Sequence, residues 1–106
     1  MSAALSPAAA IAYAARLLEA RGFAEAARNT RGDSLYLRPP GSPWHLRLSN
    51  HPRTMKQRRR RTDVLTSLVI DAPRSTEQVE TLVRGAQANF FAALRRRDGA
   101  DLASDP

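Results

Sequence analysis

The first third of the chain places apolar residues at the spacing of an α-helix. Ser6 is positioned to cap this helix, and Pro7 follows at the first helical position, where its missing N–H costs no hydrogen bond. Apolar residues then recur every three or four positions, at Ile11, Ala14, Ala15 and Leu18. Gly22 is the predicted left-handed stop, and residues 24–33 are expected to add a helical turn before turn-forming residues end it.

From Ser34 the apolar period changes to two, which is typical of strands. One set of alternating positions is apolar and comprises Leu35, Leu37, Trp44, Leu46 and Leu48. The opposite set, which we expect on one open and solvated sheet face, comprises Tyr36, Arg38, His45 and Arg47. The proline-rich residues 39–43 between the two runs cannot join a strand ladder, so the pattern predicts a hairpin with its loop there.

The last part of the chain predicts one more strand and a second helix. Residues 64–70 mix alternation with β-branched side chains, which indicates a more buried strand. Ser75 and Gln78 have the spacing of a capping box, and an apolar stripe that includes Leu82 then runs to about Arg97. Asp98-Gly99 is the predicted stop, and residues 99–106 are expected to form a flexible acidic tail.

These elements predict an α+β fold with the order α-β-β-β-α. In this two-layer arrangement, a three-stranded antiparallel sheet buries one face under both helices. The 106 residues suffice for a single domain, which we place at residues 1–98. Its core is expected to be thin, because 19 of the apolar residues are alanine and only six residues are aromatic.

The positive charge of the chain is concentrated in one segment. The formal net charge is +7, and residues 45–62 contribute +7, while residues 1–44 contribute +2 and residues 63–106 contribute −2. Six basic residues from Arg53 to Arg61 have no acidic residue between them, so we expect residues 52–62 to form a mobile basic loop. Such a field indicates a polyanionic partner, either nucleic acid or an acidic protein face. The alternative is a solvated surface loop without a partner.

Nine residues are predicted to bind nucleic acid or a partner protein. They are Tyr36, Arg47, His51, Arg53, Lys56, Arg58, Arg59, Arg60 and Arg61. The basic side chains would contact phosphates, with a strong dependence on salt and a weak dependence on base sequence. Tyr36 could stack a base on the open sheet face, and His51 could instead bond back to the chain and hold its turn. The arginines at 95–97 are explained by the dipole at the C-terminal end of a helix.

The sequence argues against an enzyme, a cofactor and a metal site. It has no cysteine, which removes thiolate nucleophiles and cysteine-ligated metals, and it lacks glycine-rich phosphate cradles. A metal-dependent nuclease would have to combine His45 or His51 with Asp63, and these are the only two histidines. No apolar run approaches the roughly 20 residues of a membrane-spanning helix, so we expect a cytoplasmic protein without membrane contact.

The string Arg47-Leu48-Ser49-Asn50-His51 carries a resemblance to known proteins. With Ser34-Leu35-Tyr36 on the strand before it, and an apolar strand and amphipathic helix after it, the string resembles a group of small phage and prophage proteins. That group includes a type II anti-CRISPR protein that blocks Cas9. The resemblance spans roughly residues 34–90 and implies an α/β domain with a disordered basic region that inactivates a guide-RNA nuclease in an infected bacterium. This chain lacks the long basic N-terminal extension of that group and carries its charge at residues 53–61 instead.

Two functional hypotheses follow. The first is a non-enzymatic, phage-encoded inhibitor that binds a CRISPR effector protein or its guide-RNA complex through the arginine-rich loop, in the cytoplasm of the host bacterium. The second is a general nucleic-acid-binding protein that contacts RNA or DNA directly, because α-β-β-β-α is also the order of the double-stranded RNA-binding domain. That family has a basic start to its last helix, whereas this chain has Ser75-Thr76-Glu77-Gln78 there.

Overall fold

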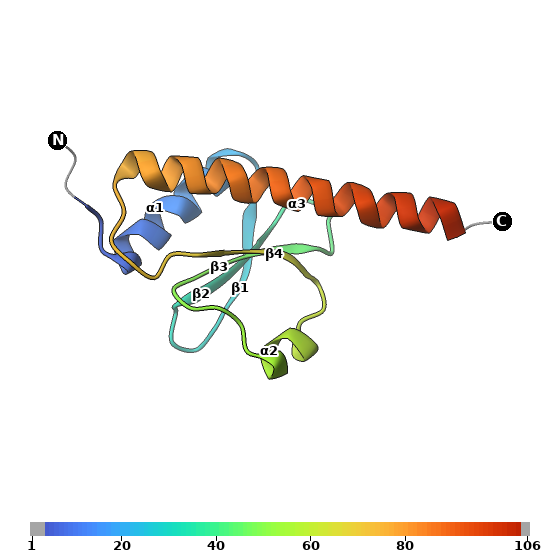
Figure 1. Cartoon of the computed structure of the whole chain (residues 1–106), viewed down its shortest axis with the longest axis horizontal. Coiled ribbons are helices and arrows are strands. Elements are labelled where there is room, and N and C mark those ends of the chain that lie inside the picture. Colours follow the sequence, from blue (N-terminus) through green and yellow to red (C-terminus); the bar gives the residue numbers. More distant parts are fainter. Residues whose placement is uncertain (1–3, 105–106) are drawn as a thin grey trace.

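The computed structural model describes residues 4–104, with side chains described up to Arg97. Along the chain the elements are α1 (Pro7–Ala20), β1 (Ala24–Arg28), β2 (Ser34–Arg38), β3 (His45–Ser49), α2 (Met55–Arg60), β4 (Val64–Val69) and α3 (Thr76–Ser104). In Figure 1, α1 and α3 lie on one side of the sheet and the short helix α2 lies on the other. The fold is therefore α+β. Within residues 4–104, no helix has the length and apolar character needed to span a membrane.

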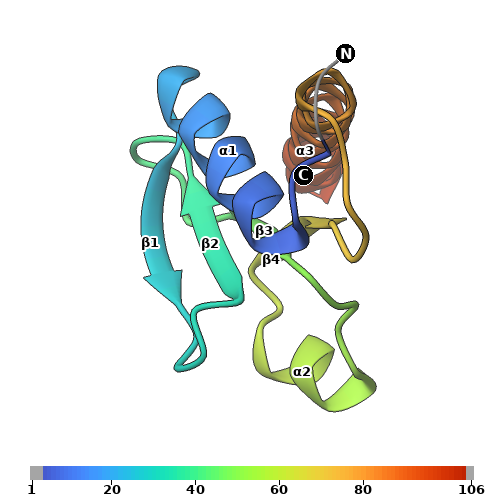
Figure 2. The ribbon, with the colours of Figure 1, turned by 90° about the vertical axis from the view of Figure 1, so that its left-hand side faces the viewer.

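The sheet has four strands in the order β1-β2-β3-β4. The first three strands pair antiparallel, and β4 runs parallel to β3. In Figure 2, β1 lies at the left edge of the sheet and α3 points along the line of sight. The predicted three-stranded antiparallel sheet is therefore wrong in the number of strands and in the direction of the last one.

Residues 24–28 form the edge strand β1, where the sequence predicts a further helical turn. Their sequence, AEAAR, contains strong helix formers and no apolar alternation, so nothing local indicates a strand. Pairing with β2 decides the conformation, with Ala24 opposite Arg38 and Arg28 opposite Leu35. The turn predicted at residues 29–33 is present, but it joins two strands, with Gly32 at a φ of +75°.

The connection from β3 to β4 is a crossover. Fourteen residues separate Ser49 from Val64, which is enough chain to bring β4 back parallel to β3. We call residues 50–63 the crossover segment. It contains α2, so the predicted basic loop at residues 52–62 is helical over six of its residues.

The core lies between the sheet and the two long helices. The leucines that alternation assigns to the core are buried there, at Leu35, Leu37, Leu46 and Leu48. α3 contributes the fully buried Val79, Val83 and Phe90. Phe23, which follows α1, packs edge to face against Phe90 with ring centres 5.4 Å apart. Trp44, predicted in register with the buried leucines, is only partly buried, and the Arg97 guanidinium lies 4.4 Å from its ring centre.

The predicted helix starts are confirmed. Ser6 Oγ accepts a hydrogen bond of 3.2 Å from the backbone N–H of Ala9 at the start of α1. Ser75 and Gln78 form both bonds of the capping box before α3, at 2.9 and 3.2 Å. Gly22 adopts a φ of +96° at the end of α1, as its predicted role as a stop requires.

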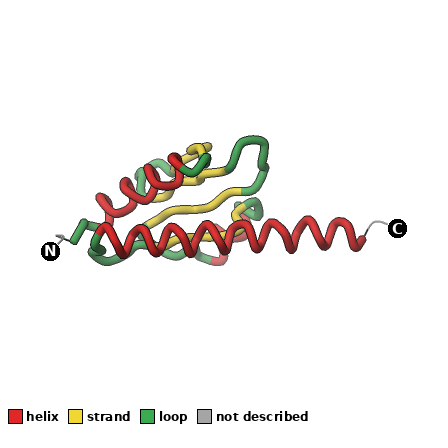
Figure 3. The backbone as a smooth tube through the Cα atoms, turned by 90° about the horizontal axis from the view of Figure 1, so that it is seen from above, coloured by secondary structure: helices red, strands yellow, loops and turns green. Residues whose placement is uncertain are grey.

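The predicted end of α3 is wrong. The helix passes through Asp98-Gly99, continues to Ser104 and extends well beyond the sheet, as Figure 3 shows. One glycine costs a helix only about 1 kcal/mol relative to alanine, and the alanines and leucine that follow favour helix. Most of the predicted acidic tail is therefore helical, and its last two residues, 105 and 106, lie outside the described residues.

Candidate nucleic-acid interface

The short helix α2 carries a concentrated, exposed positive charge. Thr54 caps it, because its Oγ1 accepts from the Gln57 N–H at 3.2 Å while Gln57 Oε1 accepts from the Thr54 N–H at 2.9 Å. The charged side chains of the helix are all exposed and comprise Lys56, Arg58, Arg59 and Arg60. None of these four side chains forms an ion pair or a hydrogen bond with another described residue. The helix therefore presents four uncompensated cations to solvent.

The crossover segment is attached to the sheet through an arginine and a tyrosine. The Arg61 guanidinium carbon lies 3.8 Å from the centre of the Tyr36 ring on β2. Arg53 Nη1 donates a hydrogen bond of 3.0 Å to the Arg61 carbonyl oxygen, which ties the two ends of α2 together. One face of the Tyr36 ring is thus covered by Arg61, so that face is not open to a stacking base as the sequence predicts.

Arg47 on β3 is 1% exposed, although alternation predicts it on an open sheet face. His45 on the same strand is 8% exposed. Both residues alternate with the buried leucines as predicted, but the crossover segment passes over this face and covers it. Arg47 Nη2 donates to His51 Nδ1 at 3.2 Å and lies 3.5 Å from Ser34 Oγ. Arg47 therefore lies beneath the basic surface and is not part of it.

His51 links Arg47 to the turn between β1 and β2. A guanidinium can only donate, so in the neutral form of His51 Nδ1 accepts from Arg47 and Nε2 carries the ring proton. Nε2 lies 3.7 Å from Asp33 Oδ1. The Asn29 amide donates a hydrogen bond to Asp33, and this bond, aided by the charge of Arg31 and by that of the His51 ring when it is protonated, holds the pKa of Asp33 below its usual range. His51 thus holds the chain after β3.

The structure separates the nine predicted binding residues into three groups. The exposed group on α2 comprises Lys56, Arg58, Arg59 and Arg60. The group that anchors the crossover segment comprises Tyr36, Arg53 and Arg61. Arg47 and His51 form a third group beneath the segment. Only the first group forms an exposed basic surface.

A second basic surface lies where α3 passes the start of β4. A groove of about 460 Å³ is lined there by Val64, Leu65, Ala93, Arg96 and Arg97. The sequence explains the arginines at 95–97 by the dipole at a helix end, but α3 continues to Ser104, so that explanation is wrong. Arg97 instead packs on Trp44.

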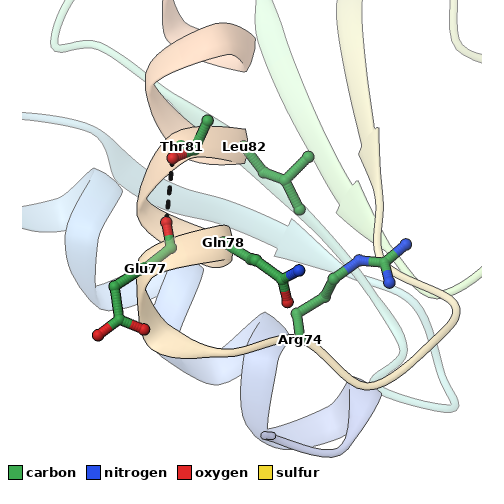
Figure 4. Close-up of a pocket in the computed structure, with 5 residues that line it drawn as sticks. All are labelled: Arg74, Glu77, Gln78, Thr81 and Leu82. Carbon is green, nitrogen blue, oxygen red and sulfur yellow. Dashed lines mark hydrogen bonds between the residues drawn. The ribbon is translucent and has the colours of Figure 1, made fainter. Parts of the chain in front are cut away.

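A pocket of about 360 Å³ at the start of α3 is lined by Arg74, Glu77, Gln78, Thr81 and Leu82 (Figure 4). Two of its polar side chains, those of Gln78 and Thr81, form hydrogen bonds to backbone groups at the start of α3. Gln78 completes the capping box, and the Thr81 hydroxyl donates to the Glu77 carbonyl oxygen at 3.0 Å. Leu82 lines this open pocket and is only partly buried, so it does not lie at the centre of the core.

Each histidine lies beside one aspartate. His45 Nδ1 is 3.1 Å from Asp63 Oδ2, within ion-pair distance but without the alignment of a hydrogen bond, and His51 pairs with Asp33. Neither pair gathers a third ligand, because the described side chains include no group of three or more His, Cys, Asp or Glu that could hold a metal ion. The backbone N–H of His45 also donates to the Asp63 carbonyl oxygen at 2.8 Å, so this pair fixes the end of the crossover segment.

Comparison with protein-family models, with curated proteins and with solved structures finds no match to this chain. The resemblance at residues 47–51 is therefore neither supported nor opposed by a relative.

Proposed function

We propose that this protein binds nucleic acid along the phosphate backbone, using the exposed cations of α2. The observation that carries the proposal is that four basic side chains project from one six-residue helix without an ion-pair partner among the described residues. Like charges held this close repel one another unless an anion neutralises them. A duplex supplies one negative charge per about 1.7 Å of its axis, which suits so short and so charged a helix.

Binding of this kind depends strongly on salt and little on base sequence. Each neutralised phosphate contributes about −0.7 to −0.9 to the slope of log K against log salt concentration, so four contacts predict a slope of about −3 to −4. The four basic side chains of α2 have no hydrogen bonds to described residues that would fix their direction toward base edges. This surface therefore favours contacts to the nucleic-acid backbone, which position the protein on the nucleic acid but do not recognise a base sequence.

Inhibition of a guide-RNA effector is the narrower form of this proposal. In this form the protein is a non-enzymatic, phage-encoded inhibitor in the bacterial cytoplasm, and α2 contacts guide RNA or an acidic face of the effector. It rests on the resemblance at residues 47–51. Arg47, Leu48 and Ser49 are buried in this chain, so the motif would shape the support beneath α2 while α2 makes the contact.

The order of elements does not support the likeness to a double-stranded RNA-binding domain. The order α-β-β-β-α does not describe the chain, which has an additional edge strand β1 and a strand β4 parallel to β3. We therefore propose backbone binding without a requirement for duplex RNA.

The test compares two triple variants that change the net charge equally. The α2 variant carries Arg58→Gln, Arg59→Gln and Arg60→Gln. The control variant removes three exposed charges elsewhere, through Arg16→Gln, Arg31→Gln and Arg84→Gln. Fluorescence anisotropy with labelled single-stranded RNA, duplex RNA and duplex DNA is measured over a range of salt concentrations. We expect the control to bind nearly as the wild type does and the α2 variant to lose about 2–3 units of salt slope. Equal loss in both variants would refute a site on α2, and no binding by the wild type would refute the function.

The inhibitor form needs its own readout. The purified protein is mixed with Cas9 and its guide RNA, treated with RNase and DNase, and analysed by size-exclusion chromatography. A stoichiometric complex with the effector that survives the nucleases would support the inhibitor. Association that disappears with the nucleic acid would leave general nucleic-acid binding as the function.

A further inference from the structure

Arg47 has the largest fully buried side chain among the described residues. Its Nη2 faces two neutral groups, His51 Nδ1 at 3.2 Å and Ser34 Oγ at 3.5 Å. Its Nε and Nη1 are also buried, and neither donates to any acceptor in the described part of the chain. A charged group in this position has lost its hydration without gaining a counter-charge.

The surroundings of Arg47 are positive. Burial, followed by the charges of Arg47 and Arg58, lowers the pKa of Arg53. Arg61 also has a buried nitrogen, Nη1, that donates to no described acceptor. Asp63 is the carboxylate whose charge reaches Arg53, and it lies against His45. One carboxylate, already engaged by a histidine, is therefore the acidic group shown to act on Arg53, and neither Arg47 nor Arg61 forms an ion pair with a described carboxylate.

A buried guanidinium without a counter-ion is costly, and proteins normally pair such a group with an anion. Guanidinium groups form strong, charge-assisted hydrogen bonds to phosphate. We propose that Arg47, Arg53 and Arg61 form a binding site for one phosphate group beneath the crossover segment. The proposal rests on the proposed function for the source of this phosphate, which is the backbone of the nucleic acid held by α2. Free phosphate has the same chemistry and is the alternative source.

The phosphate enters when the crossover segment lifts from the sheet. α2 has no buried residue, so lifting it exposes little apolar surface. The segment is held to the sheet by polar and stacking contacts, namely the stacking of Arg61 on Tyr36, the pairing of His45 with Asp63 and, nearer its start, the bond from Arg47 to His51. Lifting the part that holds α2 and Arg61 breaks the first two and can leave His51 in place. Arg47 stays on β3 while the segment moves, so the part of the site on the sheet is rigid.

The first test measures thermal stability in inorganic phosphate against chloride at matched ionic strength. Arg47→Met removes the charge and keeps much of the volume, and Arg38→Met makes the same change at an exposed position on β2. We expect phosphate to raise the Tm of the wild type and of Arg38→Met by about 5 °C at ten times its Kd or more, and to leave Arg47→Met unchanged. A phosphate effect of equal size in all three proteins, or no effect in the wild type, would overturn the site.

The second test needs no folded variant of Arg47. Phosphate is titrated into ¹⁵N-labelled wild-type protein, and the arginine Nε–H signals are followed by NMR. We expect one Nε–H signal that is strongly protected from solvent exchange, assigned to Arg47, to change its chemical shift and to saturate as phosphate is added. The signals of the α2 arginines should shift little at the same phosphate concentration. Shifts confined to the exposed arginines would refute the site even if Arg47→Met fails to fold.

The source of the phosphate is decided with labelled RNA. If Arg47→Met loses RNA affinity several-fold while Arg38→Met does not, the bound phosphate belongs to the nucleic acid. If inorganic phosphate protects the wild type but no nucleic acid binds, the site stands as one for free phosphate and the proposed function falls. If RNA binds through α2 and neither test detects phosphate at Arg47, this inference falls and the proposed function stands.

Discussion

The Arg61 guanidinium carbon lies 3.8 Å from the centre of the Tyr36 ring. The contact joins the C-terminal end of α2 to the second strand of the sheet, 25 residues earlier in the chain. Both residues belong to the set predicted to bind nucleic acid or a partner, but in the structure their side chains stack on each other. This contact attaches the end of α2 to the sheet, and the hydrogen bond from Arg53 to the Arg61 carbonyl oxygen ties the start of the helix to the same end.

Replacing the Tyr36 ring should loosen the crossover segment. A cation–π contact at a partly exposed site contributes about 0.5–1 kcal/mol, so Tyr36→Leu should raise local opening about two- to fivefold. Limited trypsin digestion reports this opening, because the segment holds six of the cleavage sites for that protease. Tyr36→Phe keeps the ring and should digest at the wild-type rate. Equal protection in Tyr36→Leu would show that the ring does not hold the segment.

Removing the charge of α2 should leave the global stability almost unchanged. The side chains of Arg58, Arg59 and Arg60 are exposed and form no hydrogen bond or ion pair with a described residue, so replacing all three by Gln should change the free energy of unfolding by no more than about 0.5 kcal/mol. Urea denaturation followed by circular dichroism measures this value. A loss of several kcal/mol would mean that α2 is a structural element and that its charge serves folding.

The centre of the core should lie at Phe90. Phe90 is fully buried and its ring contacts Phe23 and Phe91, with ring centres 5.4 and 5.3 Å away, so Phe90→Ala should cost about 3–5 kcal/mol. The sequence predicts a loss of about 2–5 kcal/mol for Leu82→Ala, because Leu82 shares the same helical stripe. Since Leu82 lines an open pocket, we now expect less than about 2 kcal/mol there. Urea denaturation of both variants shows which of them loses more unfolding free energy, and a larger loss in Leu82→Ala would contradict the structure.

The fold was predictable where the local signal and the tertiary outcome agree. Capping residues and apolar periodicity locate the starts of α1 and α3, and strict alternation locates β2 and β3. β1 was not predictable, because AEAAR favours a helix and becomes a strand only through pairing with β2. The direction of β4 also has no local signal. A 14-residue connection permits either an antiparallel return or a parallel crossover, and packing under α3 selects the second.

The candidate site shows the same division. The run of basic residues identifies the exposed charge of α2 without any structure. Alternation correctly separates Arg47 from the leucine face, but it does not say that the crossover segment returns over the opposite face and buries Arg47 to 1% exposure. The pairings of Arg61 with Tyr36 and of His51 with Arg47 likewise depend on where the segment lands. The sequence shows which residues are basic, whereas the tertiary structure decides which of them are exposed and which, like Arg47, are buried.

Asp33 should make the stability of the protein depend on acid pH. The hydrogen bond from Asn29 holds the pKa of Asp33 below its ordinary value of 3.8, so the folded state binds this proton more weakly than the unfolded state does. The resulting stabilisation is complete above the unfolded pKa and disappears as the pH falls through the folded pKa. Asn29→Ala should raise the pKa of Asp33, measured by NMR titration of its carboxyl carbon, and should flatten the fall of stability below pH 4. Asn50→Ala makes the same change after β3 and should leave the Asp33 titration in place. A titration of Asp33 that does not respond to Asn29→Ala would show that another group holds this carboxylate, such as His51, whose Nε2 lies 3.7 Å from Asp33 Oδ1.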